Sequence, residues 1–179
     1  MLRYPLGSCT ATTAAGLGLN IFNRLANCLY MCNIAQIVNV LQSLLLTEGP
    51  ESEKCVRTTT YYAFLLFKPH RSNTAIRVEG AGATPAEISA SASKNDKEVV
   101  LSFVNPHPDS DYRVDCALRG LSLKSGDAEI LHDTDINAYN SFEKPDTVVP
   151  QKHAVKIDGD RIGVDVPRLS VVTARVALG

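Results

Sequence analysis

The hydrophobic residues of this 179-residue chain change their spacing near the middle of the sequence. Up to about Phe67 they recur at intervals of three and four residues, which is typical of amphipathic helices. After Arg71 they alternate with polar residues, which is typical of half-buried strands. We therefore expect a helix-rich N-terminal part and a strand-rich C-terminal part, joined by a Gly- and Ala-rich linker at residues 79–85.

The N-terminal part contains three hydrophobic stripes at helical spacing. They are formed by Leu17, Ile21 and Leu25, by Ile34, Ile37, Val38, Leu41, Leu44 and Leu45, and by Tyr61, Phe64, Leu65 and Lys68. A polar loop is expected at residues 47–54, and Pro69 is expected to end the third helix. The short apolar run 31–36 is equally consistent with a buried parallel strand, because periodicity does not separate the two structures over this length.

The C-terminal part carries strand and turn signals at short intervals. Residues 99–104 are almost entirely apolar, and apolar and polar residues alternate over 112–118. Asp158-Gly159-Asp160 separates two further strand patterns and predicts a hairpin, and residues 169–178 supply a closing strand. From about residue 86 to residue 179 we predict an antiparallel β-sandwich of short strands.

Composition and length exclude several classes of protein. The hydrophobic fraction of 45% is too high for a disordered chain, and a net charge of −1 gives no basic surface for nucleic acids or anionic membranes. The longest apolar stretch, 34–46, is too short and too polar to span a bilayer, and no signal peptide is evident, so a cytoplasmic location is favoured. A complete (β/α)8 barrel, of about 250 residues, does not fit.

The sequence shows no convincing catalytic or metal-binding constellation. The five cysteines are expected to be reduced and mostly buried, with Cys28 and Cys32 on one helix face but no histidine beside them, so we expect no metal site and no cofactor. Glu48, Glu51 and Glu53 cluster in a polar loop and are expected to be solvated. The later acidic residues fall in turns, so no pair of catalytic carboxylates stands out.

Four uncharged amides lie among apolar residues and are the candidate binding groups. They are Asn33, Gln36, Asn39 and Gln42. Amides both donate and accept hydrogen bonds, which suits sugar hydroxyls. The structural alternative is that these side chains are buried and satisfied by nearby backbone groups.

Several strings resemble, in order, the end of the catalytic barrel and the C-terminal β-sandwich of the glycoside hydrolase family 51 α-L-arabinofuranosidases. They are Asn20-Ile21-Phe22-Asn23-Arg24, Met31-Cys32-Asn33-Ile34-Ala35-Gln36-Ile37-Val38-Asn39, Thr60-Tyr61-Tyr62-Ala63-Phe64, Lys68-Pro69-His70, Ser89-Ala90-Ser91-Ala92-Ser93 and Asn140-Ser141-Phe142-Glu143-Lys144-Pro145. The resemblance covers nearly the whole chain.

The resemblance implies a mixed fold, in which residues 1–75 are an α/β remnant of a (β/α)8 barrel and residues 76–179 are an antiparallel, jelly-roll-like β-sandwich. Gln36 then resembles a hydrogen-bonding residue of the arabinose subsite, with Asn33 as its neighbour, and 31–36 becomes the last barrel strand. The family is implied to remove arabinofuranosyl groups from arabinan or arabinoxylan by a retaining mechanism with two glutamates. These would lie on strands preceding Met1, so this chain is expected to lack catalytic residues and to be inactive alone.

Two other functions remain open. The chain could be a non-catalytic β-sandwich module that binds carbohydrate or packs on a partner subunit. Alternatively, a face formed by Leu41, Leu44 and Leu45 could drive association, including homo-oligomer formation.

Overall fold

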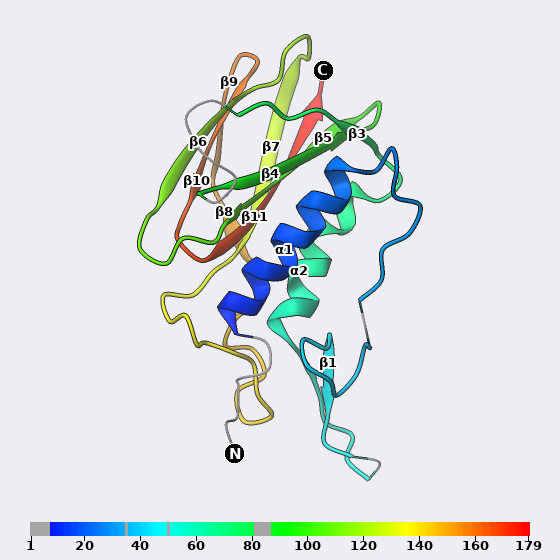
Figure 1. Ribbon diagram of the computed structural model, residues 1–179. Coiled ribbons are helices and arrows are strands. Elements are labelled where there is room, and N and C mark those ends of the chain that lie inside the picture. Colours follow the sequence, from blue (N-terminus) through cyan, green and yellow to red (C-terminus); the bar gives the residue numbers. More distant parts are fainter. Residues whose placement is uncertain (1–7, 35, 50, 81–86) are drawn as a thin grey trace.

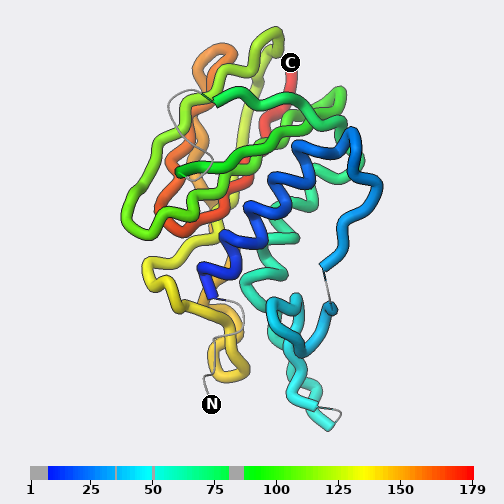
Figure 2. The backbone as a smooth tube through the Cα atoms, in the orientation of Figure 1, coloured from blue at the N-terminus to red at the C-terminus, as the bar shows by residue number. Residues whose placement is uncertain are grey.

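The computed structural model describes residues 8–34, 36–49, 51–80 and 87–179, which form three stacked layers (Figure 1). A three-stranded sheet packs on one face of a six-stranded sheet, and two helices cover the other face. The backbone trace shows the N-terminal helix running across the sheet formed by the C-terminal half of the chain (Figure 2). No helix in the described ranges is long and apolar enough to cross a membrane.

Both sheets of the sandwich are antiparallel throughout. The large sheet has the order β3 (Thr74–Ile76), β4 (Ser89–Lys94), β5 (Glu98–Asn105), β11 (Ser170–Leu178), β7 (Leu123–Leu131) and β8 (Gln151–His153). The small sheet has the order β6 (Tyr112–Ala117), β10 (Arg161–Val166) and β9 (Val155–Asp158).

The strand predictions for the C-terminal part are confirmed. The run 99–104 lies in β5, the alternating segment forms β6, and the closing strand is β11. β9 and β10 pair with Asp158 opposite Arg161, so Gly159 and Asp160 make a two-residue turn. Gly159 adopts a φ of +60°, which this type of turn requires and which glycine adopts without strain.

The space between the two sheets is filled by aliphatic side chains and one phenylalanine. Val99, Leu101 and Phe103 on β5 alternate inward, as do alternate residues of β11, and Ile162, Val164 and Val166 face them from β10. Burying side chains of this kind contributes about 1.5–3 kcal/mol each relative to exposure. This core holds the two sheets together as a β-sandwich.

The opposite face of the large sheet is covered by α1 (Cys9–Arg24), α2 (Thr59–Phe67) and the 3-10 turn η1 (Lys68–His70). The first and third hydrophobic stripes therefore predicted real helices. Tyr62, Leu66 and Phe67 of α2 pack with Val104 and Val171 of the sheet. The Thr58 side chain accepts a hydrogen bond from the backbone N–H of Tyr61 and caps the N-terminus of α2.

The helix predicted for the second stripe is wrong, and the described residues of 31–36 form no strand within this chain. The described residues between 31 and 44 form neither a helix nor a strand, and only the end of the stripe enters β1 (Leu45–Thr47). β1 pairs with β2 (Cys55–Arg57) as a hairpin, and the predicted polar loop connects the two strands. A buried parallel strand needs hydrogen-bonded neighbours, and the described part of this chain offers residues 31–36 none.

The two predicted parts of the chain are in close contact. The helices and the large sheet share one hydrophobic cluster, which includes Leu66 of α2 and Val171 of β11. β3 spans the predicted boundary between residues 75 and 76 and pairs with β4. Most of the predicted linker at 79–85 lies outside the described residues.

Candidate functional site

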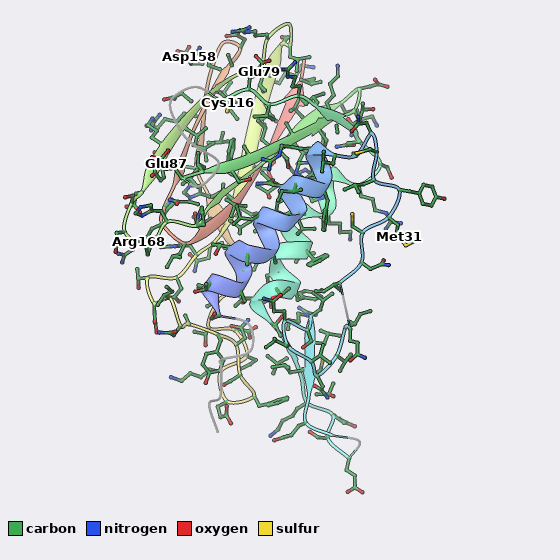
Figure 3. The ribbon with its side chains drawn as sticks, viewed as in Figure 1. Met31, Glu79, Glu87, Cys116, Asp158 and Arg168 are labelled. Carbon is green, nitrogen blue, oxygen red and sulfur yellow. The ribbon has the colours of Figure 1, made fainter. Side chains whose placement is uncertain are left out.

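Asn33 and Gln36 lie exposed in the irregular segment between α1 and β1. Within the described ranges, neither side chain makes a hydrogen bond to another residue, and neither lines the loop cavity described below. Met31, two residues before Asn33, is 67% exposed, and Figure 3 shows it projecting away from the helices. The fold therefore presents both predicted binding amides at the surface and encloses neither.

The other two amides form turns. Asn39 and Gln42 adopt φ values of 55° and 59°, in the left-handed region that asparagine tolerates better than most residues. The Asn39 side chain donates to Thr47 Oγ1 at 2.9 Å and accepts from the Thr47 backbone N–H at 2.8 Å. All four amides are exposed, so the alternative of buried, backbone-satisfied amides is wrong.

The acidic residues of the N-terminal part are solvated, as predicted. Glu48, Glu51 and Glu53 are exposed, and Glu48 forms an ion pair with Lys54 at 3.1 Å. The buried polar side chains of the described residues include no Asp or Glu. A glycosidase acid needs an environment that raises its pKa, and burial is the usual cause, so the described part of this chain offers no such residue.

The prediction of mostly buried cysteines is wrong. Cys9 is buried and Cys116 is partly buried, but Cys28, Cys32 and Cys55 are exposed. α1 ends at Arg24, so Cys28 and Cys32 do not share a helix face. Burial, with Asp133 and Asp135 nearby, raises the pKa of the Cys9 thiol to about 12, which keeps it protonated and unreactive.

A buried polar network joins the helices to the large sheet, and the sequence analysis missed it. Asn20 is fully buried, donates to Ser89 Oγ at 3.2 Å and accepts from Ser91 Oγ at 2.7 Å. The two ring nitrogens of His70 lie 2.8 Å from Ser93 Oγ and from Ser102 Oγ. The alternation of Ser with Ala over 89–93 was the signal, because it places three hydroxyls on one face of β4.

Burial of His70 affects its protonation. The side chain is 7% exposed, and desolvation lowers its pKa from 6.5 to about 4. The neutral ring can donate from one nitrogen and accept at the other, which matches the two serine hydroxyls. His70 therefore holds η1 on the sheet in its neutral form.

A loop between β7 and β8 forms a cavity of about 470 Å³. Its lining includes Asp135, Asn137, Tyr139, Ser141 and Lys144. Tyr139 is 45% exposed. In the sequence, residues 137–146 carry the family resemblance but no signal of a cavity.

Comparison with known families gives one match over most of the chain. Residues 5–170 match the model of the α-L-arabinofuranosidase C-terminal domain. A curated relative, the intracellular exo-α-L-arabinofuranosidase of Bacteroides ovatus, is 37% identical over 180 residues. The alignment covers 95% of this chain and 34% of that protein.

Solved structures show the same fold. The family 51 arabinofuranosidase of Xanthomonas axonopodis pv. citri superposes with a TM-score of 0.85 at 29% identity, over 96% of this chain and 36% of that one. The Thermotoga maritima enzyme, solved with arabinose, gives a TM-score of 0.83 at 20% identity, over 98% and 39% of the two chains.

The chain thus spans about a third of the length of the proteins that it matches. Its antiparallel sheets and covering helices correspond to the C-terminal region of these enzymes, which agrees with the resemblance seen in the sequence.

Proposed function

This chain belongs to the family of the α-L-arabinofuranosidase C-terminal domain, and on that premise we propose that it is the non-catalytic C-terminal portion of an enzyme that removes arabinofuranosyl groups from arabinan or arabinoxylan. In this proposal Gln36 and Asn33 contribute hydrogen bonds to the arabinose subsite. The acid/base and nucleophile glutamates belong to the catalytic portion of the enzyme.

The observation that carries this proposal is the set of exposed apolar side chains on α1, on α2 and in the segment that contains Asn33 and Gln36. It consists of Ile21, Leu25, Tyr30, Met31, Ile37, Val38, Leu41 and Leu65, each at least 41% exposed. We call this set the apolar face. Large exposed apolar side chains gathered in one part of a chain mark a surface that another protein surface covers. We propose that the remaining two thirds of an arabinofuranosidase covers the apolar face.

Contact with the catalytic portion also explains why the described residues of 31–44 form neither a helix nor a strand in this chain. Residues 31–36 would pair as the last strand of a (β/α)8 barrel once neighbouring strands are present, and Gln36 would then lie at the C-terminal end of that strand, where barrel enzymes bind substrate. Residues 1–75 would form the end of the barrel, and 76–179 the sandwich. Of the three leucines expected to drive association, Leu41 is 71% exposed, whereas Leu44 and Leu45 are partly buried. The alternative is that a second copy of this chain covers the apolar face.

A chimera tests the site. The matching C-terminal region of the Xanthomonas enzyme is replaced by this chain, and hydrolysis of 4-nitrophenyl α-L-arabinofuranoside is measured. We expect activity, and we expect Gln36→Ala to lower kcat/KM about fivefold, because a neutral hydrogen bond is worth about 1 kcal/mol. Asn27→Ala, an exposed amide after α1, is the matched control. Equal kcat/KM in the two variants would contradict the role of Gln36.

A further inference from the structure

The cavity between β7 and β8, here called the loop pocket, lies outside the site described above. We propose that the loop pocket binds a neutral arabinofuranosyl oligosaccharide and acts as an outer subsite for the polysaccharide; this inference rests on the proposed function. The volume of about 470 Å³ lies within the range of small-molecule sites.

The lining of the loop pocket has the chemistry that neutral sugars need. Tyr139 supplies an exposed aromatic ring, and the C–H face of a furanose can cover such a ring and remove it from water. Asn137 supplies an amide that can donate and accept hydrogen bonds, whereas the Ser141 hydroxyl donates to Glu143 and accepts from the Lys144 N–H.

The charges of the loop pocket select against acidic sugars. Asp133, Asp135 and Glu143 line it, with Lys144 as the one basic side chain of the lining and Lys54 acting on Glu143 from outside it. The hydrogen bond from Ser141 lowers the pKa of Glu143, so this carboxylate stays ionised at neutral pH. A uronate would enter a negative field, whereas sugar hydroxyls can donate hydrogen bonds to carboxylate oxygens.

The loop is held in shape from inside the molecule. Asn140 is 1% exposed; its amide group donates to Arg57 O at 2.9 Å and to Val148 O at 3.0 Å, and its carbonyl accepts from the Val148 N–H at 2.8 Å. The backbone N–H of Cys9 donates to Ala138 O at 3.2 Å. A pocket formed in this way before binding loses less entropy when a ligand enters.

The same contacts place the loop pocket at one end of the molecule. The loop contacts the N-terminus of α1 through Cys9 and the end of β2 through Arg57. Figure 1 shows that the starts of both helices, the β1 hairpin and this loop lie at the same end. Helices of a (β/α)8 barrel begin at the face that carries the active site. The loop pocket therefore flanks the face where the proposed function places substrate.

The test is a titration of the ¹⁵N-labelled chain with α-1,5-linked arabinotetraose, followed by amide chemical shifts. We expect saturable shifts in residues 133–147. Tyr139→Ala should weaken binding about tenfold, the loss expected when an aromatic contact worth about 1.4 kcal/mol is removed. Tyr112→Ala, which removes a tyrosine on β6 outside the loop pocket, should leave binding unchanged. Asn137→Ala serves as a second variant of the pocket.

The outcomes separate this inference from the proposed function. Three results would overturn the proposed role of the loop pocket. They are the absence of chemical shift changes, changes confined to residues 31–37, and equal binding by the wild type and both pocket variants. Binding of tri-galacturonate with the same affinity as arabinotetraose would contradict the preference of the loop pocket for neutral sugars. If the chimera is active but the loop pocket binds no oligosaccharide, only this inference is rejected and the proposed function is kept. If the chimera is inactive but the loop pocket binds the oligosaccharide, only the proposed function is rejected.

Discussion

At the scale of single residues, His70 shows how polar groups fix the helical layer on the sheet. Its ring is enclosed by the Ser93 and Ser102 hydroxyls, and Ser102 Oγ lies 2.9 Å from Thr173 Oγ1 on the next strand. Phe67 packs beside the ring, with centroids 5.6 Å apart. The surroundings offer hydroxyls and an aromatic ring but no carboxylate to stabilise a charged imidazole, so protonation opposes folding.

The free energy of unfolding should depend on pH through His70. The pKa of His70 is about 6.5 in the unfolded chain and about 4 in the folded protein, so the unfolded state takes up the proton first as the pH falls. The contribution of neutral His70 should be complete above pH 6.5 and should decline by the order of 3 kcal/mol between pH 6.5 and 4. Urea unfolding at pH 7.5, 6 and 5 measures this decline.

Two variants isolate the contribution of His70. His70→Gln keeps hydrogen-bonding groups beside the serines but cannot titrate, so its free energy of unfolding should fall less between pH 7.5 and 5 than that of the wild type. His107→Gln, on the loop after β5, is the matched control. Identical pH dependence in the wild type and His70→Gln would contradict this account.

At the scale of elements, α1 depends on close approach to the large sheet. Gly16 faces β5 and β11, and a Cβ atom added there would lie 2.9 Å from Val104 Cγ2 and 3.0 Å from Val171 Cγ2. Gly18, on the same helix, has no such neighbour within 4 Å. The same substitution at these two positions therefore separates helix propensity from packing.

The second prediction uses this pair of glycines. Gly18→Ala should raise the free energy of unfolding by about 0.5–1 kcal/mol, the difference in helix propensity between the two residues. Gly16→Ala gains the same propensity but overpacks the interface, which typically costs about 1–3 kcal/mol, so we expect net destabilisation. Urea unfolding compares the two variants. Stabilisation by Gly16→Ala would show that the helix can move away from the sheet at little cost.

The elements also show what the sequence could predict. β5 was predictable from its continuous apolar run and β6 from the alternation of its side chains between buried and exposed positions. α1 and α2 were predictable from apolar residues spaced three and four apart, although the face that α1 buries consists mainly of Thr, Gly and Asn. The structure of segment 31–44 was not predictable, because its hydrophobic pattern fits both a helix and a strand. Its structure also depends on neighbouring strands. The loop pocket was not predictable either, because it is shaped by contacts between residues far apart in the sequence, such as Asn140 and Arg57.

At the scale of the whole molecule, the three layers differ in how completely they are covered. The two faces of the large sheet are buried by the small sheet and by the helices. The apolar face, in contrast, is exposed, and it includes chain neighbours of the two amides with predicted roles in binding, such as Met31 and Ile37. This distribution favours a scaffold whose site is completed by another part of an enzyme, because a folded chain seldom leaves so many large apolar side chains together in water.

The central claim is that this chain supplies the framework and part of the sugar site, while the catalytic carboxylates come from the catalytic portion of the enzyme. Hydrolysis of 4-nitrophenyl α-L-arabinofuranoside by the purified chain, measured beside the Xanthomonas chimera, tests it most directly. We predict release of 4-nitrophenol by the chimera and no release above the buffer rate by the chain alone. Hydrolysis by the chain alone would contradict the claim.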